Sequence, residues 1–100
     1  SYALRKLYHE TDKALFVIYT SSSCGPCHIL KPQLQRVLNE SKGKAIGVEI
    51  DIENDQEIAK QAEVSGTPMV QLFKNKELKN QWKGVKARSE YKSALDELID

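Results

Sequence analysis

The chain has only two cysteines, three prolines and one methionine, and it lacks long apolar runs. Two cysteines are too few to hold a small secreted fold together by disulfides. The longest apolar run, ALFVIY at residues 14–19, is far too short to cross a bilayer. Lys and Arg number 15 against 14 Asp and Glu, so the basic excess that nucleic acids and anionic membranes attract is missing. We therefore expect neither a nucleic acid nor a membrane as a partner.

No repeat, low-complexity segment or linker rich in Pro, Gly or Ser divides the chain. A chain of 100 residues has room for one modest core, so residues 1–100 are expected to form a single domain. The sequence begins with Ser1 and no signal peptide is recognisable. We therefore expect either a processed product or a piece excised from a longer chain.

Residue periodicity predicts the order of the helices and strands. The predicted elements are a helix over 1–12, a strand over 15–20, a helix from Cys24 to about Ser41, a strand over 45–52, a helix over 55–63, a hairpin of strands 70–74 and 78–84, and a last helix carrying Tyr91 and Leu95. Strand–helix–strand units favour parallel pairing, and the hairpin adds an antiparallel edge. The expected fold is α/β, with a mostly parallel four-stranded sheet flanked by four helices. Pro32 is expected to kink its helix.

Both cysteines lie in one short stretch, SSSCGPCHILKPQL, where Cys24 and Cys27 are followed directly by His28. Three kinds of site use such a cluster: a c-type haem attachment, half of a zinc site, and a redox-active dithiol. A disulfide that closes so small a loop contributes little stability through loop entropy, which favours a reactive pair over a structural one.

The two metal-containing alternatives have little support around this stretch. A closed zinc site needs four ligands, and the candidates are Cys24, Cys27, His28 and His9, of which the adjacent Cys27 and His28 point in different directions on a helix. A haem would need a distal ligand such as Met69 or His9, and its attachment normally requires export. We therefore expect no bound metal ion.

Cys24 is predicted to lie where a strand has ended and a helix begins. Unpaired N–H groups and the helix dipole favour a thiolate there, which lowers the pKa of Cys24 below its ordinary value of about 8.5. Cys27 lies one turn further into the helix and is less exposed. We therefore expect Cys24 to attack a disulfide of another protein and Cys27 to resolve the mixed disulfide. Pro26 stiffens this turn, and Gly25 lets the backbone of a partner come close.

These motifs together resemble thioredoxin. The resemblance rests on CGPC after a buried strand, Pro32 within the next helix, GTP at 66–68 and Gly84 after the last strand. The stretches YTSSSCGPC, VEIDIENDQEIA and GTPMVQLFKNKE are similar to the C-terminal thioredoxin domain of the NADPH-dependent thioredoxin reductase C family of cyanobacteria and chloroplasts.

The resemblance implies a protein disulfide reductase with a redox-active Cys24–Cys27 disulfide. It implies a preceding reductase domain that binds FAD and NADPH, since the chain itself has no Gly-rich nucleotide loop. It also implies two-cysteine peroxiredoxin as a target, and the cyanobacterial cytoplasm or the chloroplast stroma as the location. The alternatives are a stand-alone thioredoxin with other targets, or a docking module without turnover.

The resemblance further assigns the residues that bind the substrate. Pro68 matches the family's cis-proline beside the dithiol, and the backbone of Thr67 would pair with an extended peptide. Gly66 and Thr67 would contact the substrate together with Pro68, Gly25 and Pro26.

Three positions depart from the common thioredoxin pattern. Ser23 stands where most members have Trp, Ile18 where they have a buried Asp, and Glu49 where many have Lys. The Asp of the family assists removal of the proton from the second cysteine. We hypothesise that Glu49 is the proton acceptor for Cys27, and the alternative is a solvated carboxylate on the strand.

Overall fold

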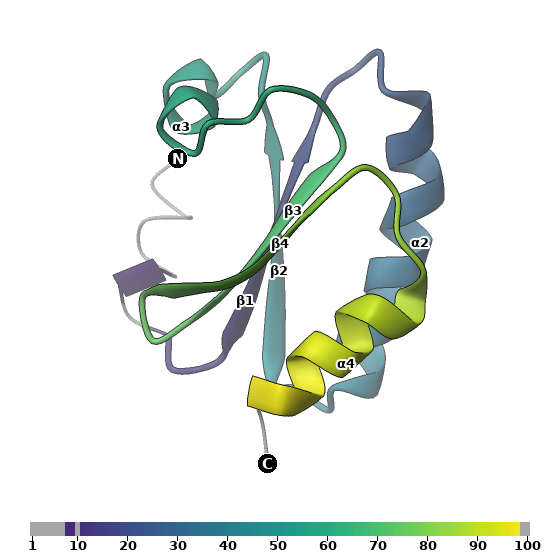
Figure 1. The fold of residues 1–100 in the computed structure, drawn as a ribbon, viewed down its shortest axis with the longest axis vertical. Coiled ribbons are helices and arrows are strands. Elements are labelled where there is room, and N and C mark those ends of the chain that lie inside the picture. Colours follow the sequence, from purple (N-terminus) through teal and green to yellow (C-terminus); the bar gives the residue numbers. More distant parts are fainter. Residues whose placement is uncertain (1–7, 10, 99–100) are drawn as a thin grey trace.

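The computed structural model describes residues 8–9 and 11–98, which form a sheet with helices on both faces (Figure 1). The described elements are β1 (Ala14–Thr20), α2 (Gly25–Glu40), β2 (Ala45–Asp51), α3 (Gln56–Gln61), β3 (Met69–Lys74), β4 (Glu77–Lys83) and α4 (Arg88–Leu98). Every strand and helix predicted within residues 11–98 is confirmed, with bounds that differ by a few residues. The predicted opening helix falls mainly on residues 1–7 and 10, which lie outside the described residues.

The four strands of the sheet run in the order β2-β1-β3-β4. β1 and β2 are parallel, whereas β1 pairs with β3 and β3 with β4 in antiparallel fashion. The predicted four-stranded sheet with an antiparallel hairpin at its edge is confirmed, and the sheet is mixed, because β3 runs opposite to the other three strands. After α3 the chain re-enters the sheet at the end where β1 stops, and Met69 pairs with Tyr19.

The hairpin between β3 and β4 follows from a two-residue loop. Asn75 and Lys76 both have positive φ angles, of 53° and 68°. Two successive left-handed residues form the turn whose twist matches that of the flanking strands, so the strands fold back as a tight antiparallel pair.

β1 is the central strand, and all seven of its residues are buried. Its unbroken apolar character had predicted this position. Because side chains alternate along a strand, Phe16 and Ile18 point toward α2 and α4, whereas Val17 and Tyr19 point toward α3. A single strand thereby contributes to the core on both faces of the sheet.

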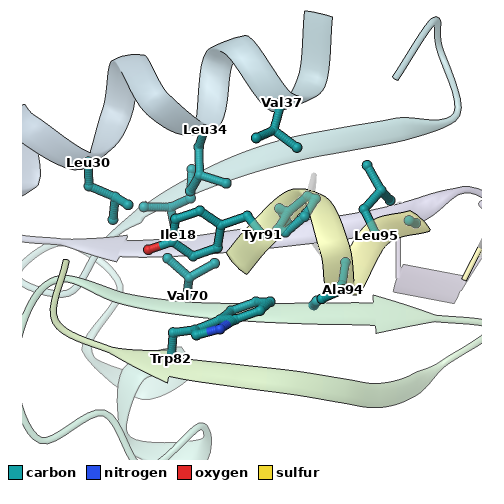
Figure 2. Close-up of a cluster of buried hydrophobic side chains, with 12 residues drawn as sticks. Ile18, Leu30, Leu34, Val37, Val70, Trp82, Tyr91, Ala94 and Leu95 are labelled. Atoms are coloured by element: carbon teal, nitrogen blue, oxygen red, sulfur yellow. The ribbon is translucent and has the colours of Figure 1, made fainter. Parts of the chain in front are cut away.

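The larger core lies between the sheet and the pair α2 and α4 (Figure 2). Its members include Leu30, Leu34 and Val37 of α2, Tyr91, Ala94 and Leu95 of α4, and Phe16, Val70 and Trp82 of the sheet. The Trp82 ring is stacked on Phe16 and meets Tyr91 edge-on, with ring centroids 6.4 and 4.9 Å apart. The only tryptophan of the chain is therefore a packing residue in this core.

α2 begins immediately after Cys24 and continues through Pro32 for 16 residues. A kink at Pro32 stays a prediction. After Ser41 the chain turns through Lys42 and Gly43, both with positive φ, and enters β2. None of the helices within the described part of the chain combines the length and the apolar character needed to span a membrane.

Candidate active site

Cys24 and Cys27 form a disulfide at the end of β1, where the chain passes into α2. Their Cα atoms are 5.4 Å apart. Both sulfur-bearing side chains are buried, with 6% of Cys24 and 1% of Cys27 exposed. Gly25 and Pro26 between them are exposed. The side of the disulfide that a partner can approach is therefore the turn formed by these two residues.

The backbone of α2 provides the electrostatic environment of Cys24. Cys24 is the N-cap residue, and its Sγ accepts a hydrogen bond of 3.2 Å from the backbone N–H of Cys27. The first turn of α2 carries no acidic residue. The N–H groups and the positive end of the helix dipole thus face a sulfur with no neighbouring carboxylate in that turn. This is the helix N-terminus that the sequence analysis predicted for Cys24, and the lowered pKa of its thiol stays a prediction.

The turn at residues 66–68 lies beside the loop that leads to the dithiol. The peptide bond between Thr67 and Pro68 is cis, as expected from the resemblance. The hydroxyl oxygens of Ser21 and Thr67 are 3.2 Å apart, within hydrogen-bond distance. Gly84 donates its N–H to the carbonyl of Pro68 at 2.9 Å, which ties the turn to the end of β4. Three segments that are distant in the sequence thereby meet at one end of the sheet.

The predicted substrate-binding residues of this turn differ in exposure. Gly66 is exposed, Thr67 is half-buried and Pro68 is buried. An approaching peptide would thus find Gly66 and Thr67 more accessible than Pro68. Their role in substrate binding stays a prediction, as do the roles of Gly25 and Pro26.

The hydrogen bonds of two serines in the loop before Cys24 were missed by the sequence analysis. Ser22 donates its hydroxyl to the Glu53 carboxylate at 2.9 Å, and Ser23 is exposed where most thioredoxins have Trp. With Ser21 bonded to Thr67, adjacent serines hold the loop to two neighbouring segments. The run of three serines directly before Cys24 was the signal that could have pointed to this function.

Glu49 faces α2, as the hypothesis about its role requires. It pairs in register with Ile18 of β1. The Glu49 carboxylate accepts a hydrogen bond from Thr20 Oγ1 at 3.2 Å and lies 2.7 Å from Lys31 Nζ. Lys31 is four residues after Cys27 and therefore one turn along the same helix. The sequence analysis missed this counter-ion, and proton transfer from Cys27 to Glu49 stays a prediction.

The residues considered as ligands of a haem or a zinc ion do not converge on one point in the described part of the chain. Both cysteine sulfurs are bonded to each other, Met69 is 1% exposed in the core, and His28 is exposed on α2. His9 packs edge-on against Tyr8. Within residues 8–9 and 11–98, no group of three or more His, Cys, Asp or Glu side chains is arranged to hold a metal ion. Of the three kinds of site considered, a redox-active dithiol is the one that agrees with the Cys24–Cys27 disulfide.

A comparison with protein families decides the classification. The thioredoxin family model matches residues 4–97. The chain belongs to the thioredoxin family. Members of this family are thiol–disulfide oxidoreductases, and the Cys24–Cys27 disulfide is the group that this chemistry needs.

Two curated relatives show which kinds of thioredoxin this family member resembles. It is 53% identical to NADPH-dependent thioredoxin reductase 3 of Arabidopsis thaliana over 95 residues, which are 95% of this chain and 18% of the reductase. It is 30% identical to mitochondrial thioredoxin of Bos taurus over 90 residues, which are 90% of this chain and 54% of that protein. The chain thus spans about a fifth of the first relative and about half of the second.

Solved structures of thioredoxins share the fold. Chloroplastic thioredoxin z superposes with a TM-score of 0.89 at 20% identity, over 98% of this chain and 88% of that one. Mitochondrial thioredoxin 3 of Saccharomyces cerevisiae in its oxidised form gives 0.84 at 23% identity, over 96% and 88% of the two chains. The thioredoxin fold expected from the resemblance is confirmed.

Proposed function

We propose that this chain passes electrons from an NADPH- and flavin-dependent thioredoxin reductase to disulfides of target proteins, such as two-cysteine peroxiredoxin. The observation that carries the proposal is the Cys24–Cys27 disulfide at the N-terminus of α2, beside the turn at Thr67 and Pro68. The link to a reductase is supported by the identity to the Arabidopsis protein, whose name describes an NADPH-dependent thioredoxin reductase.

The reaction starts from the reduced pair. The Cys24 thiolate attacks one sulfur of the target disulfide, and the other target sulfur leaves as a thiolate that takes up a proton. The Cys27 thiol then loses its proton and attacks Cys24 Sγ in the mixed disulfide, which releases the second target sulfur. Two electrons have passed to the target, and the Cys24–Cys27 disulfide of the structure has formed again. FAD and NADPH on the reductase supply the electrons for the next cycle.

The target is proposed to bind as an extended segment along the exposed backbone of Gly66 and Thr67. An extended peptide can add main-chain hydrogen bonds there in the manner of an extra strand. Its disulfide would then lie over Gly25 and Pro26, which are both exposed.

Glu49 is proposed to accept the proton of Cys27 during resolution. The support is its position on the α2 side of the sheet, held there by Lys31 on the helix that carries Cys27. Glu49→Gln should slow the release of the target while leaving formation of the mixed disulfide unchanged, because only the second step needs this proton transfer. Glu53→Gln is the matched control, since Glu53 is also a carboxylate beside the active-site loop. Equal release rates for the two variants from mildly acidic to mildly alkaline pH would contradict the role.

The chain is further proposed to be a single domain that belongs to a longer reductase chain. Its location would then be the cyanobacterial cytoplasm or the chloroplast stroma. A stand-alone thioredoxin is the second candidate, favoured by the 90% coverage of this chain by mitochondrial thioredoxin. The two differ in their electron donor, which should be a reductase of the Arabidopsis type in the first case and a separate thioredoxin reductase in the second.

The experiment that tests the proposal is a redox titration with alkylation of free thiols, read by mass, together with trapping by single cysteine variants. A disulfide reductase should titrate as one two-electron couple near the potential of about −270 mV known for thioredoxin. Cys27→Ser should trap oxidised two-cysteine peroxiredoxin covalently, whereas Cys24→Ser should not. A strongly oxidising couple would instead indicate a protein that makes disulfides, and a pair that does not cycle would leave only a docking module.

A further inference from the structure

The two polar contacts of the Glu49 carboxylate fall on the same oxygen. Thr20 donates its hydroxyl to Glu49 Oε1 at 3.2 Å, and Nζ of Lys31 lies 2.7 Å from that same oxygen. Among the residues that the structure describes, none donates a hydrogen bond to Oε2. Each carboxylate oxygen has about two lone pairs, so Oε1 is already engaged while Oε2 can still accept a proton. The carboxylate therefore has one anchored oxygen and one free oxygen.

Thr20 ends β1 on the side of the sheet that α2 covers. It is only 4% exposed, and it follows Phe16 and Ile18 at every second position, so its side chain shares their face. Glu49 is paired in parallel register with Ile18, and side chains paired in this way project to the same face. A hydroxyl buried there needs a hydrogen-bond partner, and the Glu49 carboxylate is the partner that the structure provides.

The two anchors of the carboxylate come from the two elements that flank the dithiol. Thr20 is the last residue of β1 and precedes Cys24 by four positions, whereas Lys31 follows Cys27 by four positions on α2. A shift of the carboxylate away from either element would lengthen one of the two contacts. Glu49 is therefore held in a defined position relative to both cysteines.

The exposure of Glu49 explains why such anchoring matters. The side chain of Glu49 is 48% exposed and that of Lys31 is 38% exposed. Both line a hollow of about 260 Å³ between α2 and the sheet, whose other lining residues are Ile18, Leu34, Gln35, Leu38 and Gly47. An exposed glutamate without anchors would populate many rotamers. Of the two anchors, the hydroxyl of Thr20 is the buried one, and it therefore holds the carboxylate on the inner side of this hollow.

We propose that Thr20 is a positioning residue for the second step of the reaction, the attack of Cys27 on the mixed disulfide. Its hydroxyl holds Glu49 Oε1, so that Oε2 stays available for the proton of Cys27. The proton leaves Cys27 Sγ and passes to Glu49, the resulting thiolate attacks Cys24 Sγ, and the target sulfur departs with the electron pair of the broken S–S bond. This inference rests on the proposed role of Glu49 as the proton acceptor.

The test compares Thr20→Val with Thr20→Ser. Valine keeps the shape of threonine and removes the hydroxyl, whereas serine retains the hydroxyl. Each reduced variant is mixed with glutathione disulfide as the probe, quenched with acid at successive times and read by mass. Loss of the reduced form measures the attack by Cys24, and conversion of the glutathione adduct into the Cys24–Cys27 disulfide measures the second step.

Thr20→Val should slow the second step about three- to tenfold, the effect of losing one hydrogen bond that positions the acceptor. The attack by Cys24 should stay unchanged, and Thr20→Ser should remain close to the wild type in both steps. Because Thr20 acts through the carboxylate, adding Thr20→Val to Glu49→Gln should slow the second step no further. A merely structural role of Thr20 would slow the reaction equally in both backgrounds, and that result would overturn the proposal.

Glu49→Gln separates failure of this inference from failure of the role on which it rests. If Glu49→Gln slows the second step while Thr20→Val does not, the positioning role is overturned and Glu49 keeps its proposed role. If neither variant slows the second step, both are overturned, although the chain still reduces the probe through its two cysteines. If Thr20→Val fails to fold by circular dichroism, Thr20→Ala removes the same hydroxyl and is held to the same outcomes.

Discussion

Tyr19→Phe removes a buried hydroxyl from the face of the sheet that α3 covers. Only 3% of Tyr19 is exposed, and its hydroxyl donates to Gln71 Oε1 at 2.8 Å. Gln71 is buried as well, and its amide donates to Gln81 Oε1 at 2.9 Å. Without the hydroxyl, the Gln71 oxygen loses a partner in a place that water reaches poorly. The free energy of unfolding near pH 7 should fall by about 1–3 kcal/mol.

The penalty should depend on pH. Burial raises the pKa of Tyr19 to about 12 from its ordinary value of 10.0. Below pH 10 the tyrosine keeps its proton in both states, and its full contribution to stability is present. Between pH 10 and 12 the unfolded chain loses this proton while the folded chain retains it, so stability falls as the pH rises. Two pH units correspond to a loss of about 3 kcal/mol, which the phenylalanine variant cannot show.

The assay is urea unfolding of the oxidised protein at several pH values, followed by the fluorescence of Trp82, the only tryptophan. The difference between wild type and Tyr19→Phe should be largest below pH 10 and should shrink toward pH 12. Phe73→Leu is the matched control, because Phe73 packs on the same face and carries no titratable group, so its penalty should not change with pH. A penalty for Tyr19→Phe that stays constant over this range would refute the reasoning.

Three further changes test the core and the active site. Leu34→Ala should lower the free energy of unfolding by about 2–5 kcal/mol in urea titrations, because Leu34 is only 1% exposed in the core between α2 and the sheet. A loss below about 1 kcal/mol would contradict that placement. Ser21→Ala should raise KM for a target disulfide with little change in kcat, because its bond to Thr67 holds the turn proposed to bind the substrate and not a reacting atom. Steady-state kinetics with an unchanged KM would argue against this. Lys31→Met should change the free energy of unfolding by less than about 1 kcal/mol in the same assay, because the ion pair of Lys31 with Glu49 is partly exposed. A larger loss would show that this ion pair stabilises the fold.

The order of the elements could be read from the sequence because each depends on neighbours a few residues away. The stripe of apolar residues that forms the buried side of α2 follows from a period of 3.6, and the buried strand β1 follows from an unbroken apolar run. The position of Cys24 at a helix N-terminus is local in the same sense. The dithiol site was therefore predictable from a single short stretch of sequence.

The direction of β3 was not predictable in this way. Periodicity reports which residues of a strand are buried, but it carries no information on which end of the sheet the strand enters. That end was decided in the tertiary structure, where the chain returns to Tyr19 through Met69. The same limit explains why the sheet is mixed although the strand–helix–strand order suggested parallel pairs.

The sequence by itself determined the family, the dithiol and the buried faces of the helices and strands, because these features depend on residue type and short spacings. Only the tertiary structure decided which polar groups support the site. The bonds of Ser21 to Thr67 and of Glu49 to Lys31 and Thr20 join residues that are 18–46 positions apart. Such contacts depend on how strands pair and how a helix crosses them, and a side chain's spacing in the sequence does not encode that arrangement.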